Sequence, residues 1–129
     1  MKIDHLAIWV HDLERVRTFY ETYFQAQAGP PYHNPKTHFR SYFLQFRDGC
    51  RLELMQRPDV EEPAGRPGGQ YFGIAHFALS AGSREAVDTL TERLRRDGYA
   101  VAGEPRTTGD GYYESVILDP ENNRIEITI

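Results

Sequence analysis

The sequence predicts an α+β fold made of two tandem βαβββ modules, whose strands form a curved sheet backed by helices. Strand-type alternation and helix-type periodicity follow one another in the order strand, helix, strand, strand, strand, and the whole order then occurs a second time. The length of 129 residues suits one compact domain. We therefore expect a single domain over 1–129, with module one at 1–56, a linker rich in Pro, Gly and Glu at 57–71, and module two at 72–129.

Module one alternates between patterns typical of strands and of a helix. Its expected elements are a strand at 2–10, a helix at 12–24, at best a short edge strand within the Gly- and Pro-rich 25–39, and strands at 40–46 and 50–55. Asp12 is a good N-cap for the helix. Asp48-Gly49 is a strong two-residue turn signal and predicts a hairpin. Cys50 has the strand parity of Leu52 and Leu54, so we expect it to be a small buried hydrophobe.

Module two repeats this order. Its expected elements are a strand at 72–80, a helix at 83–98, a short strand at 99–105, and strands at 112–118 and 123–129. Ser83 can cap the start of the helix, and Gly98 lies where a helix stop belongs. The "DPEN" sequence between the last two strands has good turn chemistry.

One histidine and one glutamate occupy corresponding strands of the two modules. His5 and His76 lie in the first strands, and Glu53 and Glu126 lie in the last strands. By strand alternation each points away from the aliphatic neighbours that can pack on a helix. Any one of them alone is more often structural or solvent-exposed, so the prediction depends on the coincidence of all four. If the modules pair with pseudosymmetry, the four side chains converge into a mixed N/O site that suits Ni, Zn, Co, Mn or Fe(II).

Composition excludes several classes of function. The net charge is −4 and the pI is about 5.7, and the absence of a basic block disfavours nucleic-acid binding. The longest apolar run near the start, "HLAIWV", is too short for a signal-peptide core or a membrane span. A single cysteine leaves no intrachain disulfide. We therefore expect a cytoplasmic protein without nucleic acid or membrane as a partner.

Three segments resemble the vicinal oxygen chelate superfamily, which includes glyoxalase I, bleomycin-resistance proteins, fosfomycin-resistance enzymes, extradiol dioxygenases and methylmalonyl-CoA epimerase. They are the opening "HLAIWVHDLERVRTFYETYF", the second-module opening "IAHFAL" and the closing "ILDPENNRIEIT". The resemblance implies paired βαβββ modules in an open, barrel-like mixed sheet around a divalent metal. The His–Glu–His–Glu set is most similar to that of bacterial glyoxalase I. Dioxygenases and fosfomycin enzymes lack an acid at the place of Glu53.

The resemblance also implies a reaction. A metal-dependent lyase or isomerase of the glyoxalase I type would use the metal as a Lewis acid and stabilise an enediolate of a small vicinal-oxygen substrate, with a thiol adduct as one candidate. Glu126 is the expected general base, and Glu53 is expected to be mainly a ligand or the second proton carrier. Members of this type are typically homodimers.

Other residues and other functions stay open at this stage. Trp9 shares the His5 face and can line the pocket. Arg40, Arg106, Tyr112 and Tyr113 can contact the substrate, although surface or edge-strand roles fit them equally well. One alternative function is a small-molecule binding or antibiotic-resistance protein, which would need no metal. Another is an Fe(II) extradiol dioxygenase-like enzyme, which oxygen uptake with a catechol would reveal.

Overall fold

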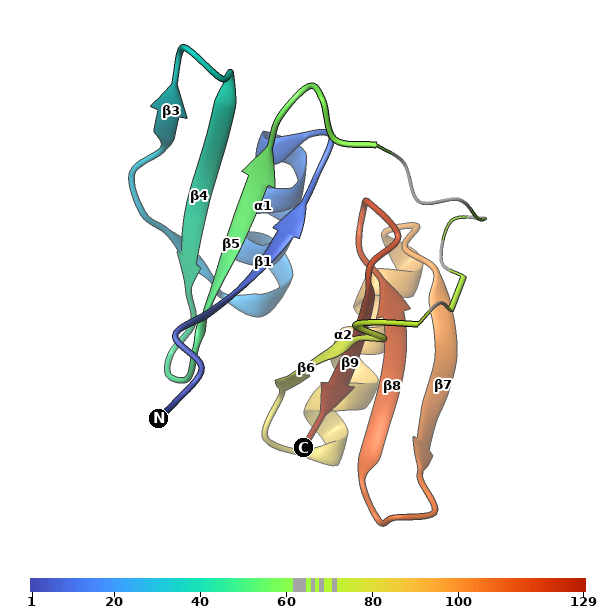
Figure 1. Cartoon of the computed structure of the whole chain (residues 1–129). Helices are drawn as coiled ribbons and strands as arrows, with labels where there is room; N and C mark the ends of the chain where they lie inside the picture. The colour runs from blue at the N-terminus through green and yellow to red at the C-terminus, as the bar shows by residue number, and fades with distance from the viewer. Residues whose placement is uncertain (62–64, 66, 68, 71) are drawn as a thin grey trace. The chain divides into compact units, whose positions relative to one another are not determined.

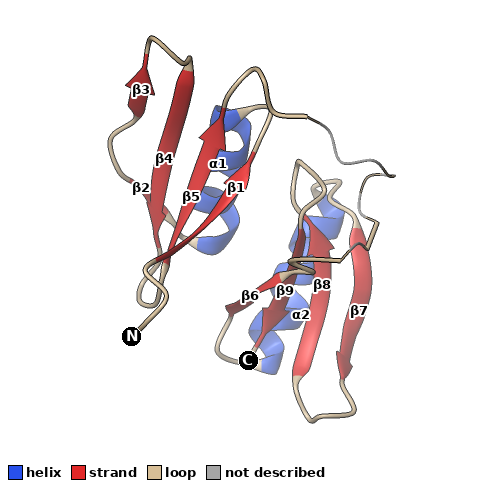
Figure 2. Cartoon of the chain, viewed as in Figure 1, coloured by secondary structure: helices blue, strands red, loops and turns tan. Residues whose placement is uncertain are grey.

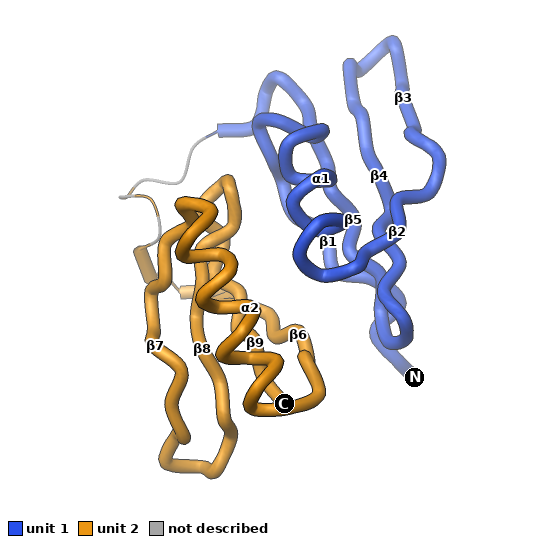
Figure 3. Tube along the Cα trace, turned by 180° about the vertical axis from the view of Figure 1, so that it is seen from behind, with its two compact units in different colours: residues 1–64 blue, residues 65–129 orange. Residues whose placement is uncertain are grey.

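The computed structural model describes residues 1–61, 65, 67, 69–70 and 72–129. The chain forms two compact units, residues 1–64 and 65–129 (Figure 3). Among these described residues, each unit contains one α-helix and one β-sheet with both parallel and antiparallel pairs (Figure 2). The predicted α+β class is therefore confirmed, with a separate open sheet in each unit.

The first unit has a helix behind a mixed sheet (Figure 1). Its elements are β1 (His5–Trp9), α1 (Leu13–Phe24), β2 (Gln27–Ala28), β3 (Tyr32–Asn34), β4 (Phe39–Gln45) and β5 (Arg51–Gln56). The sheet order is β1-β5-β4-β2, and β3 also pairs with β4. β1 runs parallel to β5, whereas the pairs that involve β4 are antiparallel. The first and last strands of the module are thus direct neighbours.

Helix α1 forms where the sequence predicts it. The Asp12 side chain accepts a hydrogen bond from the backbone N–H of Arg15 at 3.0 Å and so caps the first turn. The apolar positions recur at helical spacing and lie on one face, with Leu13, Val16, Phe19 and Tyr20 buried. This face packs on β4 and β5, whose inward row includes the fully buried Leu44 and Leu54.

The second unit repeats the arrangement of the first (Figure 1). Its elements are β6 (Phe77–Ser80), α2 (Arg84–Arg96), β7 (Val101–Thr107), β8 (Tyr113–Leu118) and β9 (Arg124–Thr128). The sheet order is β6-β9-β8-β7, with β6 parallel to β9 and β8 antiparallel to its two neighbours. Ser83 caps α2 by accepting from the backbone N–H of Ala86, and Gly98 follows the helix with a φ of 90°.

Three local details differ from the sequence-based expectations. The strand expected at 72–80 begins only at Phe77, so His76 immediately precedes β6. The 25–39 segment contains two short edge strands, separated around Pro30 and Pro31, which have no N–H to donate to a neighbouring strand. Cys50 is exposed, so its expected burial is wrong. It lies in the turn just before β5, where strand alternation does not apply.

The expected linker at 57–71 lies only partly within the described structure. Its residues 62–64, 66, 68 and 71 lie outside the described residues. At its start, the guanidinium of Arg57 forms an ion pair with Asp59 at 2.5 Å. Within the described ranges, neither helix has the length and apolar character needed to cross a membrane.

Candidate metal centre

In the first unit, His5 and Glu53 lie on the face of the sheet opposite the helix. Glu53 is registered against Ala7, two residues beyond His5, so the two side chains point to the same side. The Nε2 atom of His5 lies 3.8 Å from the Oε2 atom of Glu53. Leu52 and Leu54 flank Glu53 in sequence and are buried on the other face. The strand alternation that the sequence predicted for this carboxylate is therefore confirmed.

Glu53 is the more enclosed member of this pair. Its side chain is 14% exposed, against 40% for His5. Within the part of the chain that the structure describes, the polar contact of its carboxylate is the His5 ring, at a distance too long for a hydrogen bond. A largely enclosed carboxylate is costly unless a charge or a hydrogen-bond donor compensates it. A divalent cation between the two side chains would supply that compensation.

The other ring nitrogen of His5 has a carboxylate partner of its own. Nδ1 lies 2.9 Å from Oδ2 of Asp4, and the guanidinium of Arg51 donates to the same oxygen at 2.5 Å. The hydrogen bonds from His5 and Arg51 lower the pKa of Asp4 below its ordinary value, with the positive charge of Arg51 contributing further. Asp4 is therefore an ionised acceptor beside the ring.

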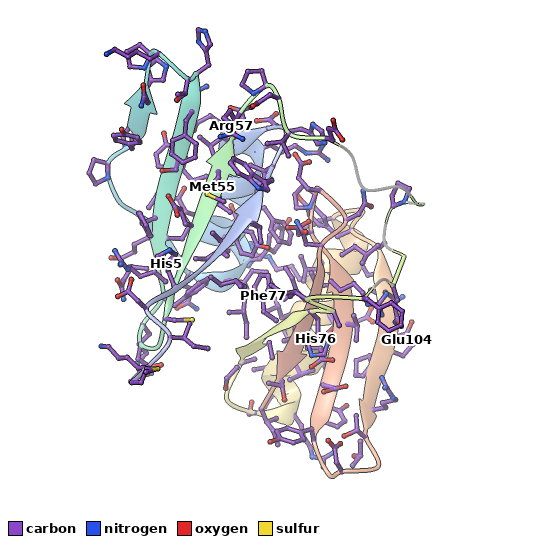
Figure 4. The ribbon with its side chains drawn as sticks, viewed as in Figure 1. His5, Met55, Arg57, His76, Phe77 and Glu104 are labelled. Carbon is purple, nitrogen blue, oxygen red and sulfur yellow. The ribbon has the colours of Figure 1, made fainter. Side chains whose placement is uncertain are left out.

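The second unit contains the equivalent pair. Nε2 of His76 lies 3.1 Å from Oε2 of Glu126, and the Glu126 side chain is 18% exposed. Glu126 is registered against Ala78, two residues beyond His76, as Glu53 is registered against Ala7 in the first unit. His5 is the first residue of β1, and His76 directly precedes β6 (Figure 4). Each unit thus brings one imidazole and one carboxylate together at the same place in its topology.

The donor atoms of each pair fit a divalent transition metal. Imidazole nitrogen and carboxylate oxygen are ligands that Zn, Ni, Co, Mn and Fe(II) accept. In each pair the histidine Nε2 atom lies within 4 Å of a glutamate carboxylate oxygen. This distance is close to the separation of two ligand atoms bound to one metal ion. Among the described residues, no group of three or more His, Cys, Asp or Glu side chains is placed to hold a metal.

The five residues expected to contact a substrate lie on different faces. Trp9 shares the His5 face of β1, is 41% exposed, and has Phe39 against its ring at a centroid distance of 6.1 Å. Arg40 has the parity of Tyr42, whose hydroxyl reaches Glu14 of α1, so Arg40 belongs to the helix face. Arg40 therefore lies on the face of the sheet opposite to His5 and Glu53.

The remaining three candidates belong to the second unit. Arg106 is registered against Glu114 on the Glu126 face, with its Nη2 atom 3.9 Å from the Glu114 carboxylate. Tyr112 lies in an exposed turn before β8. The hydroxyl of Tyr113 donates to Asp88 of α2 at 2.7 Å, so its ring lies on the helix face, away from Glu126.

The sequence-based reasoning missed two residues near the pairs. Asp4 was given no role, although its place directly before His5 was a usable signal. Glu114, whose side chain is 12% exposed, is a second enclosed carboxylate on the Glu126 face. Strand alternation in "YYESVIL" predicts that Glu114 and Val116 point to the same face of the sheet. The structure shows that this is the Glu126 face, because Val116 is registered against Glu126.

Comparison with known proteins identifies the family. The chain matches the Glyoxalase/Bleomycin resistance protein/Dioxygenase superfamily over residues 2–127, and it belongs to that superfamily. The uncharacterized protein YqjT of Bacillus subtilis (strain 168) is 28% identical over 130 residues, which cover 95% of this chain and 94% of that protein.

Solved structures share the two-module fold. Glyoxalase I from Zea mays superposes with a TM-score of 0.78 at 22% identity, over 98% of this chain and 44% of that chain. This chain therefore spans less than half the length of the maize protein. A structure described as a possible glyoxalase from Bacillus cereus has a TM-score of 0.71 at 26% identity, over 100% of this chain and 99% of that chain. The resemblance read from the sequence is thereby confirmed at the level of superfamily and fold.

Proposed function

We propose that the protein is a metal-dependent lyase or isomerase of the glyoxalase I type. One observation carries the proposal, namely that each βαβββ unit presents a histidine Nε2 to a glutamate carboxylate at the same topological place. Membership of a superfamily that includes glyoxalases agrees with it. The substrate class is a small molecule with two adjacent oxygen atoms, such as the adduct of a thiol with a 2-oxoaldehyde.

In this proposal His5, Glu53, His76 and Glu126 would together hold one divalent metal. The set requires a first unit to meet a second unit, either within one chain or across a homodimer. Its two imidazoles are neutral ligands and its two carboxylates are anionic, so the set neutralises the charge of a divalent cation. The metal, when bound, supplies a Lewis acid that polarises the substrate oxygens.

The carboxylates then account for proton transfer. Glu126 takes the proton from the carbon beside the substrate carbonyl and returns it to the neighbouring carbon, so that no proton is gained or lost overall. Glu53 is the second carboxylate, mainly a ligand, and serves as the alternative proton carrier. Low exposure of both side chains limits competition from bulk water for the proton.

The deciding experiment combines metal analysis with activity. The purified protein is analysed for bound metals, stripped, and reloaded with Ni, Zn, Co, Mn or Fe in turn, and each form is assayed with methylglyoxal and glutathione. We expect about one metal per four-ligand set and turnover with at least one of these metals. The control variant is Glu104→Gln, which should keep full activity. Glu104 is an exposed residue of β7, and its carboxylate pairs with Arg95.

Two results would contradict this function. If the metal-stripped protein still bound the adduct of methylglyoxal and glutathione at full strength, a small-molecule binding protein would be favoured. Oxygen uptake with a catechol in the Fe(II) form, without turnover of the glutathione adduct, would favour a dioxygenase-like enzyme.

A further inference from the structure

A four-residue cluster of Asp4, His5, Phe43 and Arg51 fixes the orientation of the His5 ring. His5 and Arg51 are register partners on neighbouring strands; Nδ1 of His5 lies 2.9 Å from Oδ2 of Asp4, and Arg51 donates to the same oxygen at 2.5 Å. The His5 ring meets Phe43 edge-on at a centroid distance of 5.3 Å, and the Arg51 guanidinium lies 4.4 Å from the centre of the Phe43 ring. The imidazole is thus held by a hydrogen bond on one edge and by an aromatic contact.

The Asp4 contact also decides which ring nitrogen is available. An ionised carboxylate is an acceptor only, so the 2.9 Å contact requires the hydrogen to be on Nδ1 of His5. In the neutral ring the other nitrogen, Nε2, then has a free lone pair. That lone pair belongs to the atom that lies 3.8 Å from Glu53.

We propose that Asp4 is a positioning residue that selects the Nδ1–H tautomer of His5 and presents Nε2 as a metal ligand beside Glu53. The inference rests on the proposed metal-dependent function. Arg51 anchors the Asp4 carboxylate, and Phe43 limits rotation of the ring. A carboxylate behind a ligating histidine fixes its orientation and raises its basicity, and its removal typically weakens metal binding by about 10- to 100-fold.

The second unit provides an internal contrast. The residue before His76 is Ala75, whose methyl side chain cannot accept a hydrogen bond from the ring. The two histidines therefore differ in how they are held, although they occupy equivalent places. The effect of Asp4 is accordingly confined to His5.

Because the Asp4 side chain is exposed, its proposed role in orienting His5 can be tested separately from any contribution to the free energy of unfolding. The Asp4 side chain is 65% exposed, and exposed ion pairs add little to the free energy of unfolding. The pair between Glu104 and Arg95 is a close match, because Glu104 is 66% exposed and the contact is also 2.5 Å. Glu104→Ala therefore controls for loss of an exposed carboxylate, and only Asp4→Ala should alter the metal site.

The test uses two measurements on the full chain. The tautomer of His5 is read from ¹⁵N chemical shifts of the imidazole in metal-free protein at roughly pH 8, above the ordinary range of histidine titration. The affinity for Zn²⁺ is measured by competition with a chelating dye. We expect His5 to carry its hydrogen on Nδ1 in the wild type, and Asp4→Ala to lose this preference and to bind Zn²⁺ about 10- to 100-fold more weakly.

Three further variants make the result specific. Asp4→Asn keeps an acceptor oxygen and should restore much of the tautomer preference. Arg51→Met removes the anchor and should cause a smaller loss than Asp4→Ala. Glu104→Ala should leave the tautomer and the affinity unchanged.

The inference is overturned if wild-type His5 carries its hydrogen on Nε2, or if Asp4→Ala binds Zn²⁺ within twofold of the wild type. Absence of Zn²⁺ binding by the wild type would instead refute the proposed function. The tautomer measurement would still show whether Asp4 orients the ring, so the two failures are distinguishable.

Discussion

The His76 and Glu126 pair shows at the residue scale how strand geometry places reactive groups. Alternation puts the isoleucines beside Glu126 into the core, with Ile125 and Ile127 fully buried, and turns the carboxylate to the opposite face. The imidazole reaches it from just before the neighbouring parallel strand, at 3.1 Å. The same physical constraint therefore creates the core and the candidate ligands.

The proposed roles of the two glutamates predict different kinetic effects. Glu126→Gln should lower kcat by about 10²- to 10⁴-fold at saturating metal, because it removes the general base. Glu53→Gln should mainly raise the metal concentration needed for activity, because it removes a ligand. Steady-state kinetics across a metal titration separate the two, with Glu104→Gln as the control. Full kcat in Glu126→Gln would show that another group moves the proton.

At the scale of elements, one tyrosine in each unit ties a strand to its helix. Tyr42 of β4 donates to Glu14 of α1 at 2.8 Å, and Tyr113 of β8 donates to Asp88 of α2 at 2.7 Å. Both strands lie next to the strand that contains the glutamate of the pair. These contacts hold the helix on one face of the sheet and leave the opposite face to the histidine and glutamate.

The Tyr42 contact predicts a pH-dependent contribution to stability. The hydrogen bond to Glu14 raises the pKa of Tyr42 and, in return, lowers the pKa of Glu14. The contribution is complete below the ordinary tyrosine pKa and is lost as the pH rises through the raised value. At acid pH it is lost as the pH falls through the lowered pKa of Glu14.

Urea denaturation across the pH range checks this prediction. Wild type should be more stable than Tyr42→Phe near neutral pH, and the difference should shrink towards both extremes. Tyr112→Phe, which alters an exposed turn residue, is the matched control. A difference that stays constant with pH would mean that the Tyr42 hydroxyl acts through packing and not through Glu14.

At the scale of the whole molecule, the candidate ligands are divided evenly between the two units. His5 and Glu53 belong to residues 1–64, whereas His76 and Glu126 belong to residues 65–129. Each unit has its own sheet, helix and buried apolar residues. A metal that uses both pairs would therefore couple the two units thermodynamically.

Metal-linked thermal stability tests this coupling. A metal at 100 times its dissociation constant adds about 2.7 kcal/mol, which raises the Tm of a chain of this length by roughly 10 °C. His5→Ala and His76→Ala should each abolish most of that rise, since each removes a ligand from a different unit. His33→Ala, at an exposed position in β3, is the control. Retention of the full rise in either ligand variant would show that one unit binds metal alone.

Sequence patterns predicted the order of elements in both units, apart from the second short edge strand in the first unit. The capping residues Asp12 and Ser83 begin the helices as expected, because caps and periodicity act over a few neighbouring residues. Strand alternation likewise predicted the faces of Glu53 and Glu126. It failed at Cys50, because a residue in a turn has no strand parity. The exact start of β6 was also missed, because it depends on pairing with β9 rather than on local pattern.

Local rules in the chain therefore specify the strand and helix order of each unit, apart from the extra short strand β3, and the faces on which His5, Glu53 and Glu126 lie. Contacts between distant segments decide the rest. The pairing of β1 with β5 places Asp4 and His5 beside Arg51, and hydrogen bonds to the helices assign Tyr42 and Tyr113 to the helix faces. Such contacts depend on strand register and side-chain packing across long sequence separations, which periodicity along the chain does not encode.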